Sequence, residues 1–174
     1  MTDTYDPSTD IVDRIAGLTP GSATHTTRHR RDKVATATQR SYEALLDPAL
    51  PDLSLRDRLL VAFYACRLSK APALAAHYTE RLAAAGVDRA SIEQIDEGSI
   101  DAQEPRLRAM LTFTRALIER PIEGDRTALE RLQAAGIPTP AVVALAQLIA
   151  FLSYQIRLVA GVAALQALNT REAA

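Results

Sequence analysis

A single histidine interrupts an apolar, alanine-rich run in the middle of the chain, where residues 73–78 read Ala-Leu-Ala-Ala-His-Tyr. An imidazole titrates near neutral pH, so a histidine beside a bound substrate can give and take protons. The alternative is a partly buried histidine that hydrogen bonds to a carbonyl or carboxylate and does no chemistry. His77 is therefore the first candidate for acid–base chemistry, and its surroundings decide between the two interpretations.

The only cysteine, Cys66, follows Leu55, Leu59 and Phe63 at helical spacing. This spacing predicts that the thiol lies on the apolar face of a helix, where a free cysteine behaves as a small hydrophobic residue. A reactive cysteine needs an accessible thiolate beside a cation, and the nearest basic residues leave the helix in other directions. One cysteine also excludes an intrachain disulfide. Cys66 is a candidate nucleophile only if the fold exposes it.

Polar side chains are set into the most apolar stretch, residues 141–168. Gln147, Tyr154 and Gly161 are seven residues apart, so they share one line along a helix, and Ala150 and Arg157 lie beside that line. Buried without partners, such polar groups would each cost about 1–3 kcal/mol. We expect them to pair within a structural network or a subunit contact, or else to line a ligand pocket.

His25 and His29 are four residues apart and can reach one metal ion from one helix face. The sequence supplies no obvious third ligand, so we expect no metal. The surrounding run, residues 27–33, is basic, but it has no interleaved aromatic residues for base stacking. We interpret it as a solvated surface that pairs with acidic residues elsewhere. No phosphate loop or other cofactor motif is present, and no cofactor is expected.

These candidates must be positioned by helices, because helix-forming residues dominate and no useful alternation of β-branched residues occurs. We predict an all-α fold with a central helical hairpin at about 54–85 and a long final helix. Capping residues, prolines and glycines bound the segments. The expected helices are 10–18, 24–46, 54–70, 72–85, 88–95, 105–119, 125–135 and 139–168.

Length and composition restrict the class of protein. The 174 residues have a formal net charge of −1, with 48% hydrophobic and 24% charged residues. This describes one globular domain, expected at 10–170 after a mobile tail at 1–9. Near-zero charge argues against a dedicated nucleic-acid binder. Arg157 near the middle of the apolar stretch favours a buried core helix over a membrane span. The first ten residues lack the features of a signal peptide, so we expect a cytoplasmic protein.

The order of these segments resembles the carboxymuconolactone decarboxylase-like (CMD) and alkylhydroperoxidase AhpD-like families. The resemblance covers about residues 10–168 and is closest to CMD-domain proteins that lack the thiol motif. The resemblance is carried by six short sequence segments. They are Leu-Ser-Leu-Arg-Asp-Arg-Leu-Leu-Val-Ala at 53–62, Ala-Ala-His-Tyr at 75–78, Ala-Ala-Ala-Gly-Val-Asp at 83–88, Glu-Pro-Arg-Leu-Arg-Ala-Met-Leu-Thr-Phe-Thr at 104–114, Leu-Gln-Ala-Ala-Gly-Ile at 132–137 and Ala-Gln-Leu-Ile-Ala-Phe-Leu-Ser-Tyr-Gln-Ile-Arg-Leu at 146–158.

The redox motif of active AhpD-like proteins is missing from the chain. That motif is Glu-x11-Cys-x-x-Cys-x3-His, in which two thiols cycle through a disulfide. Anchored on His77, the motif places its cysteines at Lys70 and Ala73 and its glutamate at Arg58. Using Cys66 as either cysteine does not restore the pattern. The resemblance therefore implies a family member without disulfide-cycling peroxidase chemistry.

The resemblance implies three functions. The first is a thiol-independent enzyme or binder of an unidentified small molecule, in which His77 acts as acid and base while Tyr154 and Arg157 donate hydrogen bonds and clamp an anion. The second is a non-catalytic partner of a CxxC-bearing AhpD-like paralogue. The third is residual peroxidase activity by Cys66 with an external thiol. Family members assemble as trimers or hexamers, so a homo-oligomer is also implied.

Overall fold

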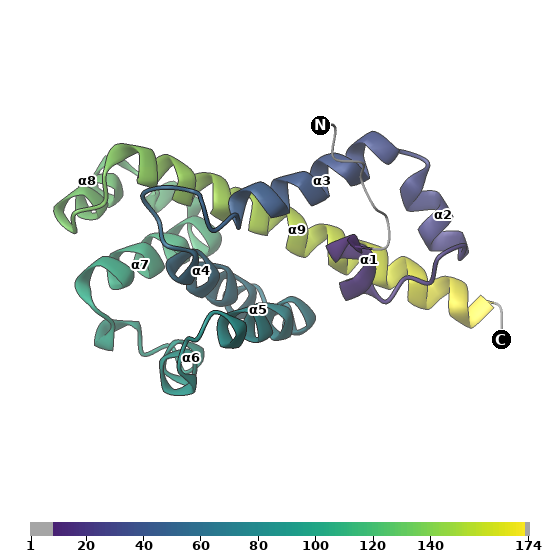
Figure 1. The fold of residues 1–174 in the computed structure, drawn as a ribbon, viewed down its shortest axis with the longest axis horizontal. Helices are drawn as coiled ribbons and strands as arrows, with labels where there is room; N and C mark the ends of the chain where they lie inside the picture. Colours follow the sequence, from purple (N-terminus) through teal and green to yellow (C-terminus); the bar gives the residue numbers. More distant parts are fainter. Residues whose placement is uncertain (1–8, 173–174) are drawn as a thin grey trace.

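The computed structural model describes residues 9–172, which are helical throughout, apart from the connecting turns, and contain no strand (Figure 1). The predicted all-α class is confirmed. Residues 1–8 of the expected tail lie outside the described part. The elements are α1 (Ile11–Ala16), α2 (Ala23–His29), α3 (Asp32–Leu45), α4 (Leu55–Leu68), α5 (Pro72–Ala84), α6 (Arg89–Asp96), the 3-10 turn η2 (Ile100–Ala102), α7 (Pro105–Glu119), the 3-10 turn η3 (Pro121–Glu123), α8 (Arg126–Ala134) and α9 (Thr139–Glu172).

The helices begin where the sequence supplies a capping side chain. Ser54, Asp88 and Asp125 each accept a hydrogen bond from the backbone N–H three residues on, at the start of α4, α6 and α8. Pro72 and Pro105 occupy the first turns of α5 and α7, where a missing N–H costs nothing. Local capping therefore explains why these boundaries were predicted to within a residue or two.

The α4–α5 hairpin is the centre of the fold, as predicted. Every residue of α4 from 58 to 66 is buried, because α5, α7 and α9 pack around it. The chain reverses between the two helices at Lys70, whose φ of 53° lies in the left-handed region. The hairpin places Cys66 and His77 on neighbouring helices.

α9 runs along the length of the molecule and joins two groups of helices (Figure 1). α4, α7 and α8 pack against one part of it, and the N-terminal helices α1, α2 and α3 pack against the other. By length and composition α9 could also cross a membrane, although the core helices of soluble proteins pass the same test. Part of α9 lies inside the fold, since 28% of its most apolar window is buried.

The single helix predicted for 24–46 is wrong, because the chain breaks between α2 and α3. Arg30 ends α2, and Arg31 leaves the helical region with φ −114° and ψ 62°. No glycine or proline marks this break. The bend turns Arg28 and His29 toward α1, where acidic side chains bind them, so tertiary contacts outweigh the local helix preference.

Candidate functional site

His77 is buried in a chain of hydrogen bonds that links three helices. It is 5% exposed on α5. Its Nδ1 lies 3.0 Å from Nη2 of Arg14 on α1, and its Nε2 lies 2.8 Å from the phenol oxygen of Tyr42 on α3. Arg81, one helical turn after His77 on α5, donates from Nη1 to the same phenol oxygen at 2.8 Å. These four residues form what we call the His77 network.

The donors fix where the protons of this network lie. A guanidinium can only donate, so Nδ1 of His77 must accept from Arg14 and the ring proton must sit on Nε2. That Nε2–H then donates to Tyr42, whose oxygen already accepts from Arg81. Both lone pairs of the phenol oxygen are used. Within the described residues the phenol hydrogen has no acceptor, so it is available to a bound molecule.

Burial and two cations keep the imidazole neutral. Desolvation, the largest cause, acts together with the positive charges of Arg14 and Arg81 to lower the pKa of His77 from 6.5 to about 4. The pKa of Tyr42 is raised because burial disfavours the phenolate, an effect that Arg81 partly offsets. At neutral pH the network therefore holds a neutral histidine and a protonated tyrosine between two arginines.

A groove of about 650 Å³ lies beside this network on the side of α3 and α5. Tyr42 and Arg81 line it, together with Gln39, Glu43, Leu46 and Asp47. His77 is not among its lining residues and lies behind Tyr42. A molecule in the groove would lie against Tyr42 and Arg81, while the imidazole would act on it only through Tyr42.

The two polar residues expected to work with His77 have other partners. Tyr154 on α9 is 43% exposed, and its hydroxyl lies 2.9 Å from Oγ1 of Thr38. Arg157 is exposed and donates to the carbonyl of Ser153 in its own helix at 2.6 Å. No hydrogen bond in the described part of the chain joins either residue to His77. Arg157 is exposed on α9, whereas the half-exposed Tyr154 lies beside α3.

Cys66 lies fully inside the core, with no exposed surface. Burial raises the pKa of its thiol to about 12, so the reactive thiolate is not populated at neutral pH. The interpretation of Cys66 as a buried hydrophobic residue agrees with this environment. A nucleophilic role would need the core around α4 to open.

Arg58, at the position where the resemblance places a glutamate, is a structural residue. It is 1% exposed. Its guanidinium donates to the carbonyls of Leu53, Leu45 and Asp47 at 3.1, 2.7 and 2.9 Å. These contacts hold the segment between α3 and α4 against the start of α4. The guanidinium is buried against these carbonyls and is therefore not accessible to a substrate.

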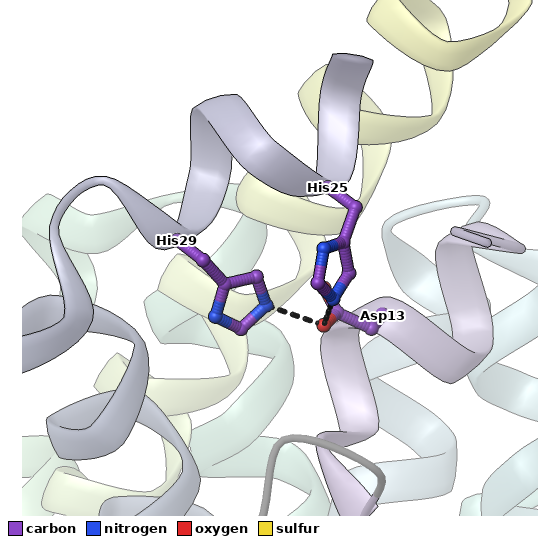
Figure 2. A group of neighbouring side chains, drawn as sticks. All are labelled: Asp13, His25 and His29. Atoms are coloured by element: carbon purple, nitrogen blue, oxygen red, sulfur yellow. Dashed lines mark hydrogen bonds and ion pairs between the residues drawn. The ribbon is translucent and has the colours of Figure 1, made fainter. Parts of the chain in front are cut away.

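A second polar cluster lies where α1 meets α2 and contains Asp13, His25 and His29 (Figure 2). Oδ2 of Asp13 lies 2.6 Å from Nε2 of His29 and 3.7 Å from Nε2 of His25. The three ligand atoms lie within 4.8 Å of one another. The pair His25 and His29 was visible in the sequence, but its acidic partner, on another helix, was not.

Sequence reasoning missed Tyr42, Arg14, Arg81 and Asp13 as site residues. Tyr42 carries no sequence signal that separates it from the apolar residues of its helix, because its hydroxyl gains its partners only in the fold. The spacing of His77 and Arg81, four residues apart, was a usable signal, because such residues share a helix face. Arg14 and Asp13 come from α1, whose docking against α5 and α2 no local pattern reveals.

Comparison with known proteins gives no family for this chain. No protein-family model matches the sequence, and a search of curated proteins finds no significant relative.

Proposed function

We propose that the chain binds a small molecule bearing a carbonyl or carboxylate group in the groove beside Tyr42 and Arg81. One observation carries the proposal: the oxygen of Tyr42 accepts hydrogen bonds from His77 and Arg81, which leaves its own hydrogen for a ligand oxygen. Arg81 supplies positive charge at the same place, as an anion or a polarised carbonyl requires.

The network also supports proton transfer to such a ligand. Tyr42 is the general acid in this proposal, because its raised pKa keeps it protonated at neutral pH. When the phenol gives its proton to the ligand, Nε2–H of His77 and Nη1 of Arg81 stabilise the phenolate that remains. The proton returns from water or product. His77 is thus a positioning residue that acts through Tyr42.

We propose in addition that the chain is related to the thiol-free CMD-domain proteins and lies in the cytoplasm. The buried thiol of Cys66 favours thiol-independent chemistry over residual peroxidase activity. Tyr154 and Arg157 do not line the groove and have no role in this chemistry.

The test measures, by NMR or thermal shift, whether the chain binds any of a panel of short keto acids, lactones and dicarboxylates. Tyr42→Phe removes only the hydroxyl and is expected to weaken any hit at least tenfold, since a hydrogen bond to a charged ligand contributes about 1.5–3 kcal/mol. Tyr154→Phe is the matched control and should leave affinity unchanged. Equal affinity in the wild-type and Tyr42→Phe chains would refute the proposal.

A second candidate function rests on the outer face of α9. Two series of residues spaced by seven run along it, and all eight positions are exposed. Alternating steps of four and three place them on one seam, which is the pattern of a coiled-coil contact. The residues are Val143, Gln147, Ala150, Tyr154, Arg157, Gly161, Ala164 and Leu168.

We infer that this seam binds α9 of a second copy of the chain. Ala150, Gly161 and Ala164 are small enough for close helix approach, while Val143 and Leu168, about half exposed, would gain burial. Such an assembly agrees with the homo-oligomer that the family resemblance implies. A CxxC-bearing paralogue offering a similar helix is the alternative partner for the same seam.

A further inference from the structure

We propose that Asp13, His25 and His29 form a binding site for a divalent first-row transition metal, with Zn²⁺ as the expected ion. The site is separate from the groove of Tyr42 and Arg81. Two imidazole nitrogens and one carboxylate oxygen make a donor set that suits Zn²⁺. Figure 2 shows the two rings and the carboxylate directed toward one another from α2 and α1.

The helices place the ligands with little freedom. His25 and His29 are one turn apart on α2, and their ring centroids are 4.3 Å apart. Ser22 caps this helix by accepting from the N–H of His25 at 3.2 Å. Asp13 lies on α1, whose N–H groups at Val12 and Asp13 are capped by Asp10. Both helices are thus capped by side chains that the proposed metal does not use.

The distances are close to those that a bound ion requires. Zn²⁺ at about 2.0–2.1 Å from each of its ligands, arranged as a tetrahedron, sets the ligand atoms about 3.3 Å apart. His25 lies 3.7 Å from the carboxylate oxygen, and His29 lies 2.6 Å from it. His29 must therefore move back by roughly 0.7 Å, which is within the reach of a side-chain rotation. The three ligand atoms lie within 4.8 Å of one another, so the two rings must also turn toward a common ion.

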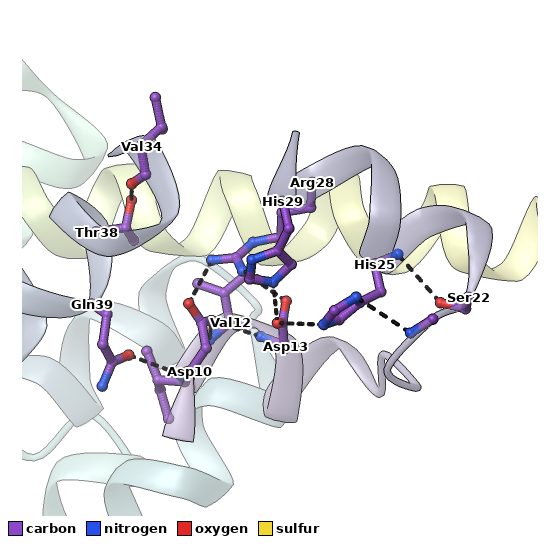
Figure 3. Close-up of polar contacts among 12 residues, drawn as sticks. Asp10, Val12, Asp13, Ser22, His25, Arg28, His29, Val34, Thr38 and Gln39 are labelled. Carbon is purple, nitrogen blue, oxygen red and sulfur yellow. Dashed lines mark hydrogen bonds and ion pairs between the residues drawn. The ribbon is translucent and has the colours of Figure 1, made fainter. Parts of the chain in front are cut away.

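Arg28 is the charged neighbour that orients the carboxylate of the site. Arg28 donates to Oδ2 of Asp10 at 3.0 Å and to Oδ1 of Asp13 at 2.8 Å, so one guanidinium is shared by two buried carboxylates (Figure 3). Nη1 of Arg28 also lies 3.1 Å from Nε2 of His29, so the guanidinium must turn away from that nitrogen when a metal binds there. Arg28 also orients Asp13, since it holds Oδ1 and leaves Oδ2 directed at the histidines.

Binding requires a change in both rings. Nε2 of His29 donates to Oδ2 of Asp13 at 2.6 Å, so a metal at this nitrogen must move the proton to Nδ1. The ring of His25 changes in the same way. The N–H of Gly21 points at its Nδ1 from 3.5 Å, which assigns the proton of the neutral ring to Nε2. A metal at Nε2 moves that proton to Nδ1 and ends this long hydrogen bond. The side chains of His25 and His29 keep 18% and 15% of their surface exposed, so water can occupy the remaining position on the ion.

The experiment is calorimetric titration of the tag-free, metal-stripped chain with ZnCl₂ in a non-coordinating buffer. We expect one Zn²⁺ per chain and at least tenfold weaker binding in His25→Gln and in His29→Gln. His77→Gln alters the only other histidine and should bind as the wild type does. Saturating Zn²⁺ should raise the Tm by about 5–10 °C at a hundredfold excess over Kd. No binding, or equal binding by all variants, would overturn the site.

A measurement on the wild-type chain covers the case in which these variants do not fold. Diethylpyrocarbonate modifies accessible imidazoles, and mass spectrometry locates each adduct. Zn²⁺ should protect His25 and His29 from modification, with a rate reduction of at least fivefold. Unchanged rates at both histidines in the presence of Zn²⁺ would contradict the proposal.

Discussion

Asp13 and Arg14 are neighbours on α1, yet their side chains enter two different polar groups. Asp13 lies 2.6 Å from Nε2 of His29 in the proposed metal site, and Arg14 lies 3.0 Å from Nδ1 of His77. α1 has six residues and is too short to be stable alone, so these contacts and its buried Ile11 and Val12 hold it in place. α1 therefore supplies one side chain to each of the two groups.

Removing the cation beside His77 should raise the pKa of the imidazole. Arg14 lowers that pKa through its positive charge, second only to desolvation. In Arg14→Met we expect the pKa of His77 to rise above about 4 but to stay below 6.5, because burial still disfavours the imidazolium. NMR titration of the ring measures it directly. Arg30→Met, which alters an exposed residue at the end of α2, is the control; an unchanged pKa in Arg14→Met would contradict the assigned contact.

His77 should make the protein less stable in acid. Its folded pKa of about 4 lies below the unfolded value of 6.5, so the unfolded chain binds the proton more readily between these values. The contribution of His77 is complete above about pH 6.5 and is lost as the pH falls through 4. By the free-energy equivalent of a pKa shift, the loss between pH 7 and pH 5 is about 2 kcal/mol.

The measurement is urea unfolding of the wild-type and His77→Gln chains at pH 7, 6 and 5. Glutamine can still accept from Arg14 and donate to Tyr42, but it does not titrate. His25 and His29 are present in both chains, so any difference in how the free energy of unfolding changes with pH comes from His77. Parallel pH profiles for the two chains would show that the imidazole is not held neutral by the fold.

Arg58 should be among the most sensitive positions for stability. Arg58→Met leaves the carbonyls of Leu45, Asp47 and Leu53 without their donor, so we expect a loss of about 3–5 kcal/mol in the free energy of unfolding. The exposed Arg56→Met is the matched control and should change stability by less than about 0.5 kcal/mol. A small effect at Arg58 would mean that water replaces the guanidinium at these carbonyls.

Cys66 should be unreactive in the folded protein. A buried thiol with a pKa of about 12 holds almost no thiolate at pH 8, so a disulfide reagent should react fully only after denaturation. Cys66→Ala should leave any peroxide consumption unchanged. Cys66→Ser should be less stable than Cys66→Ala by about 1–3 kcal/mol, because it buries a hydroxyl among apolar groups. Rapid labelling of the native chain would disprove this environment.

Local patterns in the sequence predicted the helices well where caps and prolines act within a few residues, as at Ser54 and Pro72. They failed at Arg31, where contacts made by Arg28 and His29 with α1 break a helix that its own residues favour. The same limit applies to the candidate site. His77 was found by its unusual place among alanines, but Tyr42 and Arg14 are 35 and 63 residues away from it, and only tertiary packing brings them together.

The seam on α9 predicts that adding charge to it will dissociate the assembly. Ala150→Lys combined with Ala164→Lys places two ammonium groups at positions where small residues would allow helices to meet. We expect the wild-type chain to elute as an oligomer in size-exclusion chromatography with light scattering, and this variant to shift to the monomer. Ala84→Lys with Gln133→Lys adds the same charge at exposed sites on other helices and should remain oligomeric. A monomeric wild type, or a chain recovered only in detergent, would contradict self-association, because the exposed seam would then need another partner or a membrane to cover it.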